Sequence, residues 1–264
     1  MKNNQLSFVF ILLIITLTTV IFSLIFDDYN DINLNNVLMP MFSENHLLGT
    51  DQFGRDLVAR NVRATSISLF IGFFASIISA SIGTFLGLIS GYFKSFDAII
   101  MRFVEIVQSF PTLLILIALI SILEPTINLT ILVIGLASWP PITRMVRGQV
   151  LKVRSEEYIV AAQAMGYSDL RILIYHVFLN CLSPLIIIFT LNISSAMMFE
   201  AGLSFLGLGV QPPTPSLGRM INEGKDFILS SPNLFMIPSL ILAIIIIFFN
   251  ALGEKLRETL EVKK

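Results

Sequence analysis

The chain has 264 residues, of which 55% are hydrophobic and only 13% charged, and its mean hydropathy is +0.83. These values exclude an ordinary soluble domain and indicate a protein embedded in a membrane. Lysine and arginine together number 17 against 18 acidic residues, so no excess of positive charge points to nucleic acid as a partner. The sequence has one cysteine, Cys181, and two distant histidines, so we expect no intrachain disulfide, no metal site and no cofactor.

The first apolar run covers residues 6–26 and is long enough to cross about 30 Å of hydrocarbon. It is followed by Asp27-Asp28-Tyr29-Asn30 and not by a small-x-small cleavage site. We therefore expect an uncleaved transmembrane helix and not a signal peptide.

A polar stretch follows, and within it lies the string His46-Leu-Leu-Gly-Thr-Asp-Gln-Phe-Gly-Arg-Asp56. Its candidate functional residues are Gly49, Asp51, Gly54, Arg55 and Asp56. The glycines permit tight turns, and we expect the three charged side chains to form a small network. An ordinary solvated turn is the alternative.

Residues 67–92 form the next expected span, and small residues recur in it at four-residue spacing: Ser79, Gly83, Gly87 and Gly91. Such a stripe lets a neighbouring helix approach closely, so it indicates helix packing before any role in a pathway.

The third expected span, 99–123, is interrupted by Gln108-Ser109-Phe110-Pro111. A proline frees a backbone carbonyl, which the membrane interior tolerates only where it is buried in protein or lines a cavity. Gln108 and Ser109 are therefore candidates for a translocation pathway, and a kink for helix packing is an equal alternative.

Three more spans are expected at 127–142, 172–199 and 233–250. In the fifth, Asn192 could bond to a neighbouring helix or face the pathway, and the sequence does not separate these readings. The Gly/Pro-rich segment 200–218 is expected to be a rigid re-entrant or surface structure. With six spans and both termini inside, 12 lysines and arginines are cytoplasmic and the other five of the 17 lie outside, as the positive-inside rule requires.

The loop 154–180 joins the fourth and fifth spans. Ser155 can cap a short helix there, with Glu157 in the first turn favouring the helix dipole. Gly166 is expected to end this helix in a left-handed conformation, and Ser168 to start the next. The small residues Ala161 and Ala162 leave a low-relief surface that another protein can approach.

Ala161-Ala162 followed by Gly166 resembles the EAA loop of ABC importer permeases, which forms a coupling helix in a groove of a separate ATPase subunit. Two positions depart from that motif, because its Glu is Val160 here and its Pro is Leu179. The 46–56 string resembles a signature of peptide and nickel permeases of the ABC class. So does Leu203-Ser-Phe-Leu-Gly-Leu-Gly-Val-Gln-Pro-Pro-Thr-Pro, although the family's Trp is Leu217.

The resemblance spans residues 46–257 and implies an all-α polytopic membrane protein with the type I ABC importer permease fold. That fold has six transmembrane helices, both termini in the cytoplasm and a cytoplasmic coupling helix. The implied parse is a first helix and outer loop (1–66), a permease domain (67–257, with the coupling loop 154–180) and a cytoplasmic tail (258–264). The implied coupling residues are Glu157, Ala161, Ala162, Gly166 and Arg171.

The implied function is that of an importer subunit in the bacterial inner membrane, forming half of a pathway for di- or oligopeptides. Nickel or a metal chelate is the alternative substrate. The implied partners are a second homologous permease, two ATPase subunits, an extracytoplasmic binding protein and membrane lipid. The sequence contains no G-x-x-x-x-G-K-[ST] loop, so we expect no catalytic residue here and ATP hydrolysis in the partners.

Two functions from other classes are weighed against this one. An ion-coupled secondary transporter needs ionisable groups within the membrane, and Glu105 and Glu200 are the candidates, both near predicted span ends. A membrane-embedded hydrolase needs a catalytic constellation, and His176 has no such partners in the sequence.

Overall fold

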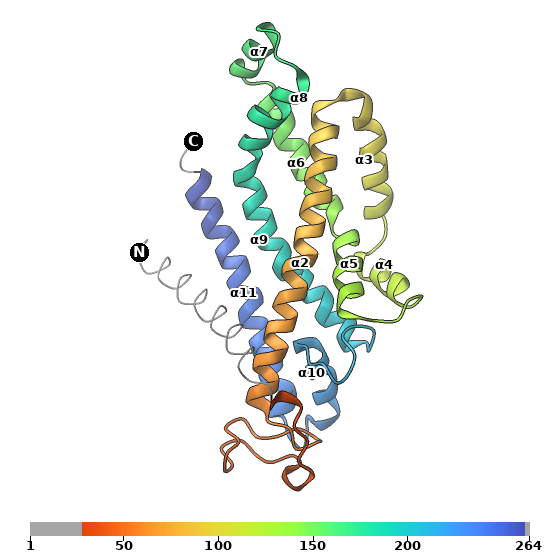
Figure 1. The fold of residues 1–264 in the computed structure, drawn as a ribbon, viewed down its shortest axis with the longest axis vertical. Helices are drawn as coiled ribbons and strands as arrows, with labels where there is room; N and C mark the ends of the chain where they lie inside the picture. Colours follow the sequence, from red (N-terminus) through yellow and green to blue (C-terminus); the bar gives the residue numbers. More distant parts are fainter. Residues whose placement is uncertain (1–27, 262–264) are drawn as a thin grey trace.

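The computed structural model describes residues 28–261, and its regular elements there are all helical. The molecule is elongated (Figure 1), with α7 at one end and the loop of residues 28–56 at the other. The helices are α2 (Leu57–Tyr92), α3 (Lys94–Gln108), α4 (Thr112–Ile120), α5 (Ile127–Ala137), α6 (Trp139–Arg154), α7 (Glu157–Ala164), α8 (Asp169–Ile172), α9 (Leu179–Phe205), α10 (Leu217–Gly224) and α11 (Asn233–Glu261). A π-helical segment, Leu173–Phe178, joins α8 to α9, and short 3-10 turns lie at Asp28–Asn30, Leu34–Asn36 and Lys225–Phe227.

Three of the described helical stretches are long and apolar enough to cross a membrane alone: Leu57–Tyr92, Asp169–Phe205 and Asn233–Leu260. Two bent pairs qualify when each is counted as one span, α3 with α4 at 80° and α5 with α6 at 41°. The described residues thus supply up to five spans, and the span predicted at 6–26 lies outside them. The prediction of an all-α polytopic fold is confirmed.

The bends correct two predicted boundaries. The third span begins at Lys94 and breaks at residues 109–111, where the proline interruption was expected. The fourth was expected to end at 142, but α6 continues to Arg154. Pro140 and Pro141 lie in the first turn of α6, where a missing N–H costs nothing because that group has no partner within the helix. They therefore start a helix instead of ending one.

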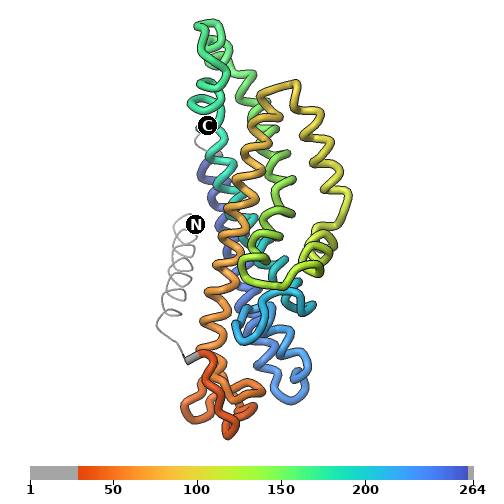
Figure 2. Tube along the Cα trace, turned by 45° about the vertical axis from the view of Figure 1, so that its right-hand side comes forward, coloured from red at the N-terminus to blue at the C-terminus, as the bar shows by residue number. Residues whose placement is uncertain are grey.

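Helix α2 runs through the middle of the bundle and packs along α5, α6 and α9, as Figure 2 shows. The predicted small-residue stripe explains the closeness of α6. A Cβ atom added at Gly83, Gly87 or Gly91 would lie 2.6 Å from the side chain of Ile142, Val146 or Val150. The stripe is a packing surface, as predicted.

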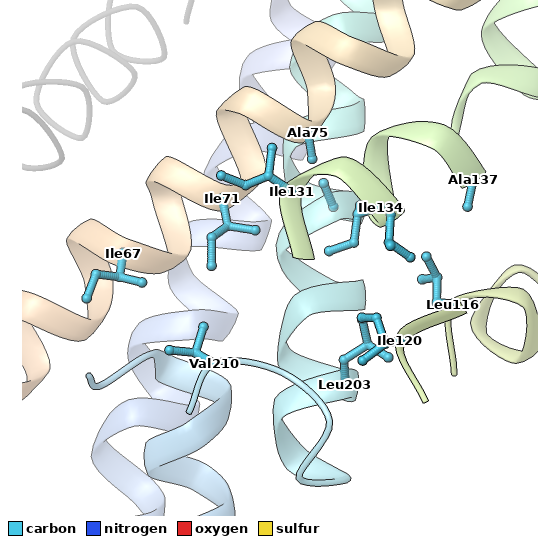
Figure 3. Packing of buried hydrophobic residues seen from close by; sticks show 12 residues of the cluster. Ile67, Ile71, Ala75, Leu116, Ile120, Ile131, Ile134, Ala137, Leu203 and Val210 are labelled. Atoms are coloured by element: carbon cyan, nitrogen blue, oxygen red, sulfur yellow. The ribbon is translucent and has the colours of Figure 1, made fainter. Parts of the chain in front are cut away.

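Three buried hydrophobic clusters fill the bundle. One joins α2, α4, α5 and α9, and Figure 3 shows Ile71, Ile134 and Leu116 directed into it from three of these helices. Many large apolar side chains remain outside the clusters, with Phe85 64% and Ile247 64% exposed. Such a surface suits lipid or partner subunits and not water.

Candidate functional site

The loop predicted to couple to another protein lies at the α7 end, between α6 and α9 (Figure 1). Helix α7 ends at Ala164, and Gly166 follows its C-cap residue Met165. The φ of Gly166 is +82°, so the predicted left-handed conformation is confirmed. The Gly166 amide donates to Gln163 O at 3.0 Å and the Tyr167 amide to Ala162 O at 3.2 Å. This pair of bonds is a Schellman motif, which satisfies the last carbonyls and fixes the direction in which the chain leaves the helix.

The start of α7 differs from the prediction. Because α6 continues to Arg154, Ser155 ends that helix, and its hydroxyl donates to Lys152 O at 2.7 Å. Glu156 occupies the N-cap of α7 in its place, and its carbonyl accepts from the Ile159 amide at 3.0 Å. Ser155 therefore does not cap α7.

The two faces of α7 differ sharply. Ile159 (0% exposed) and Ala162 (2%) pack into the hydrophobic cluster beneath the loop. This corrects the expectation that Ala162 presents a contact surface: Ile159 and Ala162 are three residues apart and share the inward face. The other coupling candidates are exposed at the surface: Glu157, Ala161, Gly166 and Arg171.

Several apolar side chains of and beside α7 are exposed, among them Tyr158 (45% exposed), Val160 (56%) and Met165 (66%). Burial, together with the charge of Glu156, raises the pKa of the Tyr158 phenol. Its hydroxyl therefore stays protonated and neutral at physiological pH. The guanidinium of Arg171 lies 4.5 Å over the ring of Tyr167, which holds it beside this surface.

The loop is tied to the end of α2. The Tyr92 hydroxyl donates to Asp169 Oδ1 at 2.8 Å, and Arg154 Nη1 donates to the Tyr92 carbonyl at 2.9 Å. Arg147 of α6 donates to Asp97 of α3 at 2.7 Å through Nη2. These bonds connect α8 and the end of α6 to the end of α2, and α6 to α3.

At the opposite end, the 46–56 string forms a compact turn. Gly49 and Gly54 have φ of +82° and +72°, so the predicted turns are confirmed. The Asp51 carboxylate accepts from the Phe53 amide at 2.8 Å, and from the Arg55 amide at 3.0 Å and its Nε at 2.6 Å. Asp56 is not in this group: it caps α2 through the Val58 amide at 2.8 Å and pairs with His46 at 2.8 Å.

The Asp51–Arg55 pair extends into a larger network that sequence reasoning missed. Arg60, 1% exposed, lies 3.3 Å from Asp51 and donates to Glu223 Oε2 at 3.1 Å. Arg219 donates to Glu223 Oε1 at 2.8 Å. The network joins the outer loop, α2 and α10, and only the fold brings residues 60 and 223 together.

The Gly/Pro-rich segment 200–218 holds a second buried polar group. Helix α9 continues to Phe205, and residues 206–216 return to the start of α10. Glu200, 0% exposed, accepts from Ser68 Oγ at 3.0 Å and from Ser204 Oγ at 2.7 Å. The Leu217 amide donates to Ser68 Oγ at 3.1 Å. These bonds fasten the returning segment to α2 and α9.

The three predicted pathway residues, Gln108, Ser109 and Asn192, do not lie at one site. Asn192 donates to Ser79 Oγ at 2.6 Å and to Ser76 Oγ at 3.2 Å, and it also lines a pocket of about 250 Å³. The bond to a neighbouring helix is therefore observed, whereas a position on the translocation pathway stays a prediction for Asn192. Gln108 and Ser109 are exposed and are not among the residues that line this pocket, whereas Thr112 of α4 is. Within residues 28–261, no three of the His, Cys, Asp and Glu side chains are placed to hold a metal ion.

Residues 83–262 match the family described as the binding-protein-dependent transport system inner membrane component. The chain belongs to this family. It is therefore a multi-pass inner-membrane permease subunit of an ABC transporter that works with a binding protein.

Individual relatives support the same placement. The permease is 36% identical to the dipeptide transport system permease protein DppC of Alkalihalophilus pseudofirmus over 267 residues, covering 100% of this chain and 88% of the relative. It is 39% identical to the DppC protein of Haemophilus influenzae, covering 83% and 74%. It is 36% identical to the glutathione transport system permease protein GsiD of Pectobacterium atrosepticum, covering 84% and 74%.

Solved structures share the permease's fold at low sequence identity. An inward-facing MetNI methionine ABC transporter chain is 18% identical with a TM-score of 0.65, covering 76% of this chain and 97% of that one. An amino acid ABC transporter chain is 16% identical with a TM-score of 0.57, covering 78% and 95%. The predicted type I importer permease fold is thereby confirmed.

Proposed function

We propose that this permease forms half of an import pathway for di- or oligopeptides and couples that pathway to ATPase subunits that are separate chains. The peptide assignment is supported by the names of its relatives, which are dipeptide and glutathione transport permeases. The observation that carries the coupling role is α7, a capped helix at one end of the bundle with a buried inner face and exposed apolar side chains.

Helix α7 has the properties that a docking helix needs. It is short, and its C-terminus is closed by the Schellman motif at Gly166, so it does not lengthen or fray when loaded. Its exposed side chains include the apolar Val160 and Met165, which suit a protein groove. The exposed charges of Glu157 and Arg171 would pair with charges of the ATPase.

Force on α7 would reach the membrane through three connections. Ile159 and Ala162 press it against the cluster formed with α6 and α9. Asp169 bonds to Tyr92 at the end of α2, and Arg154 bonds to the same residue. When two ATPases close on ATP, docked helices would move with them, and the spans would follow as rigid bodies.

The complete importer in this proposal contains this permease, a second homologous permease, two ATPases and an extracytoplasmic binding protein, surrounded by membrane lipid. The ATPases supply hydrolysis because the 264-residue sequence carries no phosphate-binding G-x-x-x-x-G-K-[ST] loop. The binding protein would dock at the end that holds the 28–56 loop and α10.

Uptake measurements test the substrate. Cells lacking the gene, and cells carrying it on a plasmid, are supplied with labelled alanyl-alanine or with labelled nickel. We expect the deletion to abolish uptake of the dipeptide and the plasmid to restore it. Loss of nickel uptake alone, with dipeptide uptake intact, would contradict the peptide assignment and favour the nickel alternative.

Substitution of Glu200 distinguishes ATP-driven import from ion-coupled transport. Because the carboxylate serves here as an acceptor for Ser68 and Ser204, we expect Glu200→Gln to keep uptake within about fivefold of the unsubstituted chain, the effect of one weakened hydrogen bond. Uptake that persists in cells depleted of ATP and disappears in Glu200→Gln would instead support an ion-coupled transporter.

A further inference from the structure

The pocket beside Asn192 contains a hydroxyl group that makes no hydrogen bond to the described part of the chain. Ser138 is 7% exposed and lines the pocket, and its Oγ is buried without a hydrogen-bond partner among residues 28–261. It stands at the 41° bend between α5 and α6. Buried hydroxyls are nearly always bonded to protein, water or ligand. The Ser138 hydroxyl is therefore available to a molecule in the pocket.

Asn192, which also lines the pocket, is held by α2. Its amide nitrogen donates to Ser76 and Ser79, so its two N–H groups are used on α2 and its amide oxygen is the group that can accept from a ligand. Ser195, one turn along α9, and Thr112, the first residue of α4, also line the pocket. The pocket thus combines hydroxyl donors with a fixed amide acceptor.

The pocket lies at the depth of the two broken spans. Ser76 and Ser79 are close to the middle of the 36-residue α2, and the pocket borders both the 80° break before Thr112 and the 41° bend at Ser138. Interrupted helices are tolerated at membrane depth where they line a cavity, and transporters place substrate contacts at such breaks.

The chemistry of the lining selects a class of ligand. Thr112, Ser138, Asn192 and Ser195 are neutral, and the other described lining residues are apolar. Hydroxyl and amide groups match the N–H and C=O of a peptide bond, whereas Ni²⁺ favours imidazole and similar ligands. At about 250 Å³, the pocket is smaller than the roughly 300 Å³ of the smallest common ligand sites. It suits one part of a short peptide.

We propose that this pocket hydrogen-bonds the backbone amide groups of a short peptide in transit, with Ser138 and Asn192 as direct contacts. The proposal rests on the import function proposed above and adds a contact site to it. The same site would serve peptides of different side chains, because the backbone is common to all of them.

Thiol labelling tests whether water and a water-soluble reagent reach the pocket. Cys181 is fully buried, so the unsubstituted chain supplies the background. Ser138→Cys is compared with Leu136→Cys, which is two residues away and 45% exposed on the apolar surface. Aminoethyl methanethiosulfonate is applied to membranes that contain the assembled transporter. We expect Ser138→Cys to react at least about tenfold faster, since the reagent requires a hydrated thiolate.

Binding is tested in the same membranes. Alanyl-alanine, supplied with binding protein and ATP, should slow the labelling of Ser138→Cys and leave that of Leu136→Cys unchanged. Ser138→Ala should lower alanyl-alanine uptake about fivefold, the effect of one hydrogen bond, without lowering the amount of protein in the membrane. Should Ser138→Cys fail to insert, Thr112→Cys, half-buried at the pocket, against Leu114→Cys, 58% exposed on α4, gives the same comparison.

The two proposals fail in different ways. The pocket proposal is overturned if the pocket and control cysteines are labelled at equal rates. It is also overturned if the dipeptide does not change the labelling rate of the pocket cysteine while dipeptide uptake proceeds. Absence of dipeptide uptake by the unsubstituted transporter overturns the peptide function, and the accessibility comparison still decides whether the pocket holds water.

Discussion

At the scale of single residues, Gly166 sets the geometry of the α7 loop through its backbone alone. An added Cβ there meets no atom within 4 Å, while φ is +82°. Any effect of substitution therefore comes from conformation and not from collision. A β-branched residue is strained in this region, whereas asparagine tolerates it.

We expect Gly166→Val to leave the permease in the membrane but to lower dipeptide uptake at least about tenfold, because a strain of about 1–2 kcal/mol redirects the chain after α7. ATPase activity of the assembled transporter should fall much less, so that hydrolysis is uncoupled from uptake. Gly166→Asn should retain most of the uptake. Full uptake by Gly166→Val would contradict the coupling role of α7.

Arg60 is the residue on which the outer network depends, since it reaches both Asp51 and Glu223. Removing one partner of a buried ion pair leaves an uncompensated charge, so we expect Arg60→Met to destabilise the protein by about 3 kcal/mol. The melting temperature in detergent measures this. Arg102→Met, which removes an exposed arginine, is the control and should change stability little. An unchanged melting temperature for Arg60→Met would show that the network does not hold α10 to α2.

At the scale of elements, the contact between α2 and α6 depends on glycine. We expect Gly87→Ala to destabilise the permease by about 1–3 kcal/mol, because the new methyl group lies 2.6 Å from Val146 Cβ and overpacks the contact. Gly148→Ala in α6 makes the same chemical change where the added Cβ would meet no atom of residues 28–261 within 4 Å, and it should be neutral or slightly stabilising. The double variant Gly87→Ala, Val146→Ala should recover part of the loss in melting temperature.

Local chemistry explains which elements could be predicted from sequence. The left-handed Gly166 and the Gly83–Gly91 stripe were predicted because each depends on a residue type and its spacing within one helix. Ser155 was misassigned because the length of α6 depends on packing against α2. The inward orientation of Ala162 did have a signal, since Ile159 lies three residues before it on the same face. Arg60 and Glu223 are 163 residues apart, and only the tertiary fold shows that they meet.

At the scale of the whole molecule, the two ends should lie on opposite sides of the membrane. We expect an impermeant thiol reagent added to intact spheroplasts to label Phe42→Cys, 77% exposed in the 28–56 loop, and not Val160→Cys, 56% exposed on α7. Inverted vesicles washed free of peripheral subunits should give the reverse pattern. Labelling of Val160→Cys from outside would overturn both the orientation and the coupling proposal.

The residues that line the pocket differ in how well the sequence could predict them. Asn192 was a candidate because a polar residue within an apolar span is unusual. Ser138 and Thr112 carry no such signal, since serine and threonine are common in membrane helices. Their role depends on the break between α3 and α4 and the bend between α5 and α6 lying beside one pocket, which α9 also lines. Only the folded structure shows this arrangement.

The unbroken length of α2 has a consequence for how quickly movement at one end of the molecule reaches the other. It begins at the Asp56 cap beside the outer loop and ends at Tyr92 against the α7 loop, without interruption over 36 residues or about 54 Å. Because α2 is one continuous helix, a tilt at its outer end also tilts its inner end at the same time. Under the proposed function, docking of a loaded binding protein outside would therefore reach the ATPase subunits inside through a single rigid element, without intermediate conformations.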